Sequence, residues 1–249
     1  MKGEEYLQHT FEVGSCDMDV WGFMKPATIL SLCQESAYMH STRMGFGYDR
    51  LHEIGAAWVL SRVKCLIHRL PKWGEKITLR TWHKGQSGLF ALRDYQFMDE
   101  SGAEIITVTT SWLIINLATR RITRVDRVFT AEDPFKLHEY KCDAIVEPAE
   151  RLEMSAEQIS LSEHHVRYSD MDVNQHVNNA RYMEWACDHT EQLMNPACRL
   201  TSFCINFNHE AKYDDIVALS GVNNATKSLV EGSIQGRSIF CAELCYCVS

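Results

Sequence analysis

The residues between positions 168 and 185 contain the densest group of side chains suited to acid–base chemistry. This run reads YSDMDVNQHVNNARYMEW and places Asp172, Asn174 and His176 at alternate positions. If the backbone there is extended, a carboxylate, an amide and an imidazole point the same way. The pattern then becomes helical, so these groups stand just ahead of a helix N-terminus. We interpret this run as a catalytic site.

The same residues also have structural interpretations. A histidine is often a core residue, but the density of polar neighbours favours a functional role for His176. Asp172 has a counterpart in Asp19, so a shared role in forming a turn stays open beside a catalytic one. Asn178 and Asn179 are more typical of helix caps than of chemistry.

The composition excludes several broad functions. The chain has 249 residues and a formal net charge of −8, whereas general nucleic-acid binders are usually basic. No run approaches the roughly 20 apolar residues of a membrane span. The first residues, MKGEEYLQHTFEV, lack the apolar core of a secretory signal. We therefore expect a cytoplasmic protein with no nucleic-acid or membrane partner.

The ten cysteines predict neither disulfides nor a metal site. A long chain without an export signal favours reduced thiols that act as small hydrophobes. Cys241, Cys245 and Cys247 lie close together, but they lack the CxxC pair or nearby histidine of a tetrahedral zinc site. We expect them to line one face of a strand, and we expect no metal and no cofactor.

The first half of the chain predicts one long helix followed by antiparallel strands. Pro26 suits the first turn of the helix, and Leu30 and Cys33 follow at helical spacing. Runs rich in Val, Ile, Thr and aromatic residues then predict strands at 58–68, 76–83, 89–98 and 104–116. In the last run, apolar residues alternate with polar ones such as Thr107 and Thr109, which predicts a half-buried strand.

The second half repeats this order after a candidate linker at residues 131–156. A strand at 159–168 precedes the polar run, and a helix capped by Asn178 or Asn179 continues with apolar spacing to Leu193. Further strands are expected at 201–209, 216–222, 229–236 and 238–247. This order indicates an α+β fold of two similar domains, at residues 1–145 and 146–249.

The two halves also share residues. The run DMDV at 17–20 recurs at 170–173, an offset of 153 (170 − 17), and we interpret Asp170 in this run as structural. At the same offset His176 matches Phe23, and a later alignment sets Glu210 against Leu70. One copy has polar groups where the other has apolar ones. This asymmetry predicts one working site in the second half and a degenerate first half that forms pocket wall.

The sequence resembles a known family. The runs DMDVNQHVNNARYMEW and FNHEAKYDD look like acyl-acyl-carrier-protein (acyl-ACP) thioesterases, the bacterial relatives of the plant FatA and FatB type enzymes, as do the first-half segments WVLSRVKCLIHRLPKWGE, LRTWHKG, FALRDYQF and SWLIIN. The resemblance covers nearly the whole chain. It implies a tandem hot-dog fold, in which each half wraps an antiparallel sheet around a long helix. It also implies hydrolysis of fatty acyl-ACP to free fatty acid and holo-ACP.

The resemblance further implies which residues act. The family's catalytic positions carry over to Asp172, Asn174, His176 and Glu210. Plant members often have a cysteine directly after that glutamate, but Ala211 occupies the place here, so a cysteine nucleophile is untenable at this position. Water activated by acid–base groups is the consistent alternative, with Glu210 and His176 together acting as general base.

Supporting roles complete this hypothesis. Asn174 orients substrate or water through its amide, and Asp172 fixes the imidazole tautomer or positions Asn174. Backbone N–H groups at the start of the following helix, around Val177–Asn179 and foremost those of Val177 and Asn178, are natural donors to the developing oxyanion.

The substrate sets two further expectations. The acyl chain needs an apolar channel, for which Trp58, Leu30 and Cys33 are candidates, although such residues are more often simply core. An acidic carrier protein needs local positive charge on this acidic enzyme. The densest basic cluster, which a solvated charged turn also explains, comprises Arg120, Arg121, Arg124 and Arg127.

Three other functions stay open. An acyl-CoA thioesterase would share the fold and the chemistry and differ only in the carrier. A hydratase or dehydratase of the same fold would usually pair its histidine and carboxylate differently. A non-catalytic acyl-binding module would bind fatty acyl groups without releasing thiol. The sequence also leaves open whether the tandem chain is a monomer of two fused hot-dogs or a homodimer.

Overall fold

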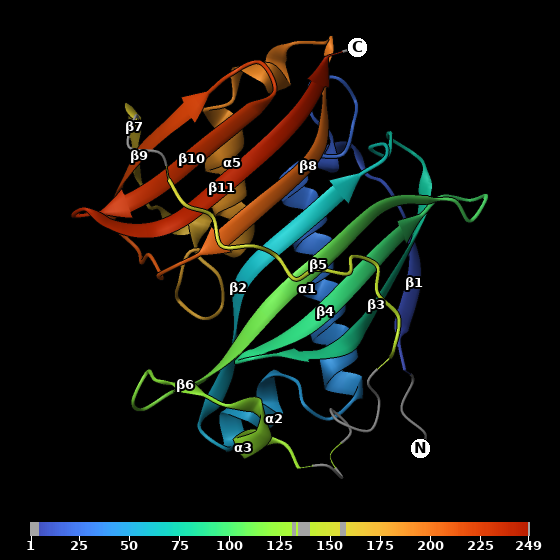
Figure 1. Cartoon of the computed structure of the whole chain (residues 1–249), viewed down its shortest axis with the longest axis vertical. Coiled ribbons are helices and arrows are strands. Elements are labelled where there is room, and N and C mark those ends of the chain that lie inside the picture. The colour runs from blue at the N-terminus through green and yellow to red at the C-terminus, as the bar shows by residue number, and fades with distance from the viewer. Residues whose placement is uncertain (1–4, 131–132, 134–139, 155–157, 249) are drawn as a thin grey trace.

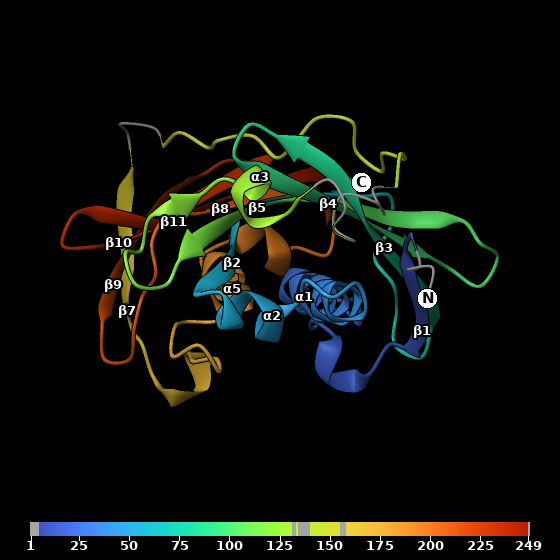
Figure 2. The same ribbon diagram turned by 90° about the horizontal axis from the view of Figure 1, so that it is seen from below.

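The chain folds into one curved antiparallel sheet that carries its two longer helices on the same face (Figures 1 and 2). The structure is a computed structural model that describes residues 5–130, 133, 140–154 and 158–248. The first half comprises β1 (Leu7–Glu12), α1 (Pro26–Arg43), α2 (Tyr48–Glu53), β2 (Ala56–Ile67), β3 (Lys76–Ser87), β4 (Phe90–Met98), β5 (Glu104–Asn116), β6 (Ile122–Thr123) and α3 (Val125–Val128). The second half comprises β7 (Ile159–His165), α5 (Asn179–Asp188), β8 (Cys198–Phe207), β9 (Ile216–Asn223), β10 (Lys227–Ile234) and β11 (Arg237–Val248).

The order of the strands shows the internal repeat directly. Within the described residues, the 11-stranded sheet runs β1-β3-β4-β5-β2-β8-β11-β10-β9-β7, and β6 pairs with β5 off this path. The strand order of the second half is therefore the mirror image of that of the first half. The two halves meet at the β2–β8 pair, in which residues 62–66 lie opposite residues 202–206. Each half curves around one helix, as the predicted tandem hot-dog fold requires.

Equivalent backbone hydrogen bonds confirm the repeat at the residue level. Val13 N donates to Glu75 O at 2.9 Å, and in the second half Val166 N donates to Asp215 O at 2.9 Å. The first residues of these pairs differ by 153 positions, which is the offset read from the sequence. Asp170 Oδ2 accepts from Arg167 N at 2.8 Å within the turn that opens the polar run, so its structural interpretation is confirmed.

The helix of the second half is shorter than its apolar spacing predicts. Helix α5 ends at Asp188 rather than continuing to Leu193, and a 3-10 turn follows at Glu191–Met194. The side chains of His189 and Thr190 contact the carbonyls of Trp185 and Ala186 at 2.8 and 2.9 Å. Side-chain bonds of this kind compete with helical backbone bonds, so the last turn does not propagate.

A segment at residues 140–152 crosses the sheet on the face away from the helices (Figures 1 and 2). Its backbone is bonded to the sheet, for example from Ala144 N to Asp94 Oδ2 at 2.8 Å. Thr107 and Thr109 on β5 are consequently buried, so the prediction of a half-buried strand is wrong there. The predicted domain boundary at 145/146 falls in this segment and stays a prediction, and part of the predicted linker lies outside the described residues.

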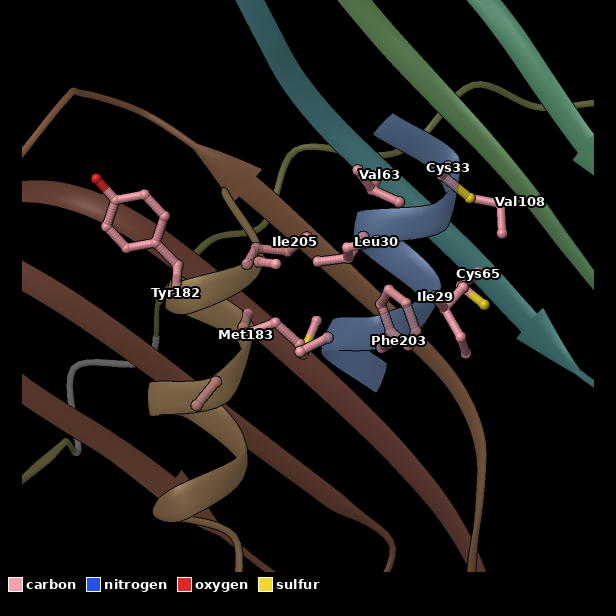
Figure 3. Packing of buried hydrophobic residues seen from close by; sticks show 14 of the residues in the cluster. Ile29, Leu30, Cys33, Val63, Cys65, Val108, Tyr182, Met183, Phe203 and Ile205 are labelled. Carbon is pink, nitrogen blue, oxygen red and sulfur yellow. The ribbon is translucent and has the colours of Figure 1, made fainter. Parts of the chain in front are cut away.

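The largest core cluster contains residues of both halves (Figure 3). Leu30 of α1 lies beside Ile205 and Met183 of the second half, and Cys33 lies near Val108 on the strand side of the same helix. All three of these apolar partners and both helix residues belong to one continuous buried cluster. The two halves are thus built around a shared core.

The cysteines behave as the sequence predicts. Among the described residues all are free thiols, and Cys33 and Cys65 are buried. Burial raises the pKa of both thiols well above the ordinary value, so they act as apolar groups. Along β11 the inward positions alternate with Cys241, Cys245 and Cys247, which therefore share the outer face of the strand.

Candidate active site

The polar run between β7 and α5 forms a tight turn rather than an extended strand. Asp172 N donates to His176 O at 2.9 Å, and Gln175, which has a positive φ of 62°, donates its N–H to Asp172 O at 3.0 Å. Asp172 Oδ1 also accepts from Asn174 N at 2.8 Å. The expectation that alternate residues share one face of an extended backbone is therefore wrong. The turn itself brings these residues to one place.

Asp172 makes the same turn in the second half that Asp19 makes in the first. Asp19 Oδ1 accepts from Trp21 N at 2.8 Å, as Asp172 Oδ1 accepts from Asn174 N. Each of these aspartates thus shapes the backbone locally. The side-chain amide of Asn174 is 3.5 Å from Asp172 Oδ2, so the turn places Asn174 against the carboxylate that forms it.

His176 and Glu210 form the central pair of the site. His176 Nε2 lies 3.1 Å from Glu210 Oε2. The two side chains are 24% and 32% exposed, so both are accessible to a substrate while partly shielded from water. An imidazole in contact with a carboxylate is the arrangement expected of a general base that activates water.

Backbone bonds next to Glu210 fix its position relative to the turn. Met24 N donates to Pro71 O at 2.9 Å, and Val177 N donates to Ala211 O at 3.0 Å in the equivalent place of the second half. Glu210 therefore stands where the first half has an apolar residue at position 70, as the alignment of the halves predicts. This fixed backbone contact holds the glutamate beside the histidine that precedes Val177.

Tyr182 of α5 secures the same point from the other side. Its hydroxyl accepts from the N–H of Ala211 at 3.1 Å. Ala211 itself is fully buried, so both of its backbone polar groups are paired inside the protein. The helix that follows the polar turn thereby helps to place the glutamate.

Arg120 is the third group at this site, and it comes from the first half. Its Nη2 donates to Glu210 Oε2, the same oxygen that His176 contacts. The sequence analysis assigned Arg120 only to a basic cluster, because nothing in the sequence relates two residues 90 positions apart. Arg120 lies next to Glu210 only because the two halves pack together.

Two of the proposed oxyanion donors are already occupied. The N–H of Val177 donates to Ala211 O, and the N–H of Asn178 donates to Asp170 O at 2.9 Å. Their predicted role as free donors is therefore wrong. The side chain of Asn178 caps the helix by accepting from Ala180 N at 2.9 Å, as the capping interpretation predicts. In the described part of the chain, the N–H of Asn179 has no acceptor.

A cavity of about 930 Å³ lies in front of these residues, and both halves line it. Trp58 belongs to its wall, as predicted, whereas Leu30 and Cys33 do not. Those two residues face the shared core, at 3% exposure each (Figure 3), whereas the residues of α1 that line the cavity are Gln34, Ala37, Tyr38 and Ser41. The residues of the second-half site on this wall are Asp172, Asn174, His176, Asn179 and Glu210.

The described residues show no group of three or more His, Cys, Asp or Glu side chains placed to hold a metal ion. None of the helices among them is long and apolar enough to cross a membrane.

Two family models together match most of the chain. The acyl-ACP thioesterase N-terminal domain matches residues 4–132, and the acyl-ACP thioesterase C-terminal domain matches residues 153–237. The chain belongs to the acyl-ACP thioesterase family. This is a family of thioester hydrolases, and its two domain models fall on the two structural halves described above.

Proteins similar to this chain include acyl-ACP thioesterases of plant chloroplasts. Oleoyl-acyl carrier protein thioesterase 1 of Arabidopsis thaliana is 25% identical over 251 residues, which covers 92% of this chain and 68% of the plant protein. Acyl-[acyl-carrier-protein] hydrolase FATB2 of Cuphea viscosissima is 27% identical over 207 residues, covering 76% of this chain and 48% of that protein. The chain thus spans about half to two thirds of the length of these relatives.

Solved structures of acyl-ACP thioesterases share the fold. The enzyme of Bacteroides thetaiotaomicron matches with a TM-score of 0.84 at 23% identity, covering 97% of this chain and 98% of that one. The 12:0-ACP thioesterase of Umbellularia californica matches with a TM-score of 0.82 at 20% identity, covering 99% and 98%. The predicted tandem hot-dog fold of α+β class is confirmed.

The cavity also has a polar wall residue that the sequence analysis missed. Arg93 of β4 lines it and is only 6% exposed. Its Nη1 lies 2.9 Å from His40 Nδ1 and 3.2 Å from Thr81 Oγ1. Arg93 falls within a strand-like run of the sequence, where its charge suggests a solvent-facing position, so no local signal reveals that it faces inward.

Proposed function

We propose that the protein hydrolyses the thioester of fatty acyl-ACP and releases free fatty acid and holo-ACP. The observation that carries this proposal is the contact between His176 Nε2 and Glu210 Oε2 at 3.1 Å on the wall of a 930 Å³ cavity. Membership of the acyl-ACP thioesterase family supports the choice of substrate. Both members of this pair come from the second half of the chain.

The proposed reaction uses water as the nucleophile. The His176–Glu210 pair takes a proton from a water molecule, whose oxygen attacks the thioester carbonyl carbon. The C–S bond then breaks, the fatty acid is formed, and the pantetheine sulfur leaves and is protonated. Ala211 cannot act as a nucleophile, because its side chain is a methyl group and is fully buried.

The oxyanion that forms during attack needs donors on the cavity wall. We assign this role to the N–H of Asn179, which stands at the N-terminus of α5 and lines the cavity. A helix N-terminus favours negative charge at its exposed N–H groups. Asn174 lies on the same wall, and its amide, held by Asp172, orients the substrate carbonyl or the water.

The test is thiol release from acyl-ACPs of varied chain length, with the matched acyl-CoAs alongside. We expect turnover on acyl-ACP in the wild type and a fall of about 10²- to 10⁴-fold in kcat for His176→Ala and Glu210→Gln. His165→Ala is the matched control, because His165 pairs with Asp214 at 2.8 Å outside the cavity. It should keep wild-type activity.

The alternatives give different results in the same assay. Turnover on acyl-CoA alone would keep the mechanism and change the carrier. Fatty-acyl binding with no thiol release from either substrate would support a non-catalytic acyl-binding module and contradict the proposal. Full activity in Glu210→Gln would remove Glu210 from the general base.

The partner in this proposal is acyl carrier protein, and its docking surface is also a proposal. Arg124 of the basic cluster is bonded to Asp126 at 2.8 Å, and Arg120 is bonded to Glu210. Arg121 and Arg127 are exposed and stay the candidates of that cluster for an acidic partner. The cytoplasmic location and the choice between monomer and homodimer stay predictions.

A further inference from the structure

Arg120 and His176 bind the same oxygen of Glu210. Both contact Oε2, from opposite halves of the chain, and no hydrogen bond to Oε1 is found among the described residues. Arg120 donates a hydrogen bond to Oε2, and His176 Nε2 lies 3.1 Å from the same atom, so the carboxylate is held at one oxygen and keeps the other for a further partner. The positive charge of the guanidinium also balances the charge of the carboxylate.

The turn that carries Arg120 is built to present it. Residue 120 has a positive φ of 56°, a conformation that is uncommon for residues other than glycine. Two backbone bonds hold it there: Arg120 N donates to Asn116 O at 2.8 Å, and Asn116 N donates to Arg121 O at 2.9 Å. Asn116 Oδ1 also accepts from the N–H and hydroxyl of Thr119. Unusual backbone of this kind is often found at functional sites.

A second contact ties the same turn to the body of the first half. Leu117 N donates to Gly55 O at 2.8 Å, just before β2 begins, and Leu117 and Arg120 both line the cavity. The turn is therefore part of the cavity wall rather than a free charged loop. An arginine presented in this way differs from the solvated surface charge that the sequence suggested.

We propose that Arg120 is a positioning residue of the active site, which the first half contributes to the catalytic pair of the second half. This proposal rests on the proposed function. Arg120 and His176 together hold Glu210 by Oε2, so that Oε1 faces the attacking water. Arg120 itself touches neither water nor thioester. The first half is accordingly more than pocket wall, because the site is incomplete without its guanidinium.

The test measures kcat and KM of Arg120→Ala, Arg120→Gly and Arg120→Lys on two substrates: acyl-ACP and the same acyl group on N-acetylcysteamine. We expect kcat to fall about 10- to 100-fold on both substrates, because a misplaced catalytic group costs rate rather than binding. The Lys variant should recover part of the loss, and added guanidinium should raise kcat of the Ala and Gly variants. Gly adopts a positive φ without strain, so it separates side-chain loss from any backbone effect.

A double mutant identifies the group through which Arg120 acts. In a Glu210→Gln background, Arg120→Ala should not lower kcat any further, because the carboxylate that Arg120 positions has already been removed. Arg50→Ala is the matched control, because it removes an arginine that is also paired with a glutamate, Glu53, but lies outside the cavity. We expect Arg50→Ala to leave kcat on the small thioester unchanged.

The outcomes that overturn the proposal are distinct from a failure of the proposed function. If the wild type hydrolyses acyl-ACP but Arg120→Ala raises only KM, and only with the ACP substrate, Arg120 is a docking residue. Equal fold losses for Arg120→Ala in the wild-type and Glu210→Gln backgrounds would show that it does not act through Glu210. A wild type that hydrolyses neither substrate would contradict the proposed function, and the proposal about Arg120 with it.

Discussion

Glu210 is held at the residue scale by groups from three separate parts of the chain. Arg120 comes from the turn after β5, His176 from the turn before α5, and Tyr182 from α5 itself through Ala211. None of these groups is adjacent to Glu210 in the sequence. The position of the Glu210 side chain therefore depends on how these elements pack. We expect substitutions in any of them to displace it.

Tyr182 provides a test of this view that leaves the catalytic pair intact. Burial raises the pKa of Tyr182 above its ordinary value, so its hydroxyl is neutral and accepts from Ala211 N. Tyr182→Phe leaves that N–H buried without a partner, which costs about 1–3 kcal/mol of unfolding free energy. We also expect kcat to fall, because Glu210 follows the position of Ala211.

Urea unfolding and thiol release measure these two effects. Tyr168→Phe is the matched control, since Tyr168 is 88% exposed and its hydroxyl is not part of the core. It should match the wild type in both measurements. A Tyr182→Phe variant as stable and as active as the wild type would show that the bond to Ala211 does not position the glutamate.

At the scale of elements, the hairpin turn between β4 and β5 is held by a side chain that must be ionised to do so. Asp99 closes the turn between β4 and β5: Oδ1 accepts from the hydroxyl of Ser101 at 2.6 Å, and Oδ2 accepts from Arg69 at 3.0 Å. The hydrogen bond from Ser101, followed by that from Arg69, lowers the pKa of Asp99 from 3.8 to about 2. The folded state thus favours the ionised carboxylate.

The lowered pKa of Asp99 predicts a pH dependence of stability with a definite sign. A carboxylate whose pKa is lower in the folded state stabilises the fold above its unfolded pKa, and this contribution is lost as pH falls through the folded pKa. Asp99→Asn should therefore be less stable than the wild type above about pH 4, with a difference that shrinks towards pH 2. Urea unfolding at a series of pH values measures this difference.

Glu100→Gln, an exposed neighbour in the same turn, is the control for the loss of a negative charge. Its stability relative to the wild type should not follow the Asp99→Asn profile. A difference between wild type and Asp99→Asn that stays constant from pH 6 to pH 2 would contradict the assigned role of the ionised carboxylate.

The elements themselves were largely predictable from the sequence, because periodicity reports which side of each element is buried. The helix from Pro26, the strands of both halves and the 153-residue offset all follow from local patterns, and the structure confirms them. The same reasoning failed where a distant segment changes the surroundings. Thr107 and Thr109 looked solvent-facing because the covering segment at 140–152 leaves no trace in the strand's own pattern.

The candidate site was predictable in its residues and not in its geometry. The asymmetry between the halves singled out His176 and Glu210, and the structure brings them together. The extended backbone assumed for the polar run is a turn, because Asp172 bonds its own neighbours in the manner typical of aspartate. Leu30 and Cys33 lie on the same helix as Gln34 and Tyr38, which line the cavity, but are themselves buried in the core, a distinction that periodicity alone cannot make.

At the scale of the whole molecule, the two halves form one structural unit. The β2–β8 pair makes the sheet continuous, α1 and α5 lie on the same face of it, and the largest core cluster draws on both halves (Figures 2 and 3). The cavity is likewise shared, with Trp58 and Arg120 from the first half and His176 and Glu210 from the second. A site divided in this way requires that the halves fold together.

Phe203 tests this requirement, since it lies at the junction. It is 1% exposed in the shared core, and it pairs with Cys65 of β2 across the boundary between the halves. Phe203→Ala removes most of a buried aromatic side chain, so we expect a loss of about 3–5 kcal/mol in unfolding free energy. Because the core is continuous, the variant should still unfold in a single transition in which both halves lose structure together.

Hydrogen exchange measured on peptides from both halves distinguishes shared from separate unfolding in this variant. Peptides of β4 and β10 should lose protection to a similar extent, although the substitution lies in neither strand. Ile159→Ala is the control, since this residue is 63% exposed on the edge strand β7, and its effect should stay within about 0.5 kcal/mol. Faster exchange confined to the second half, or two resolved thermal transitions, would show that the halves are independent domains despite their common sheet.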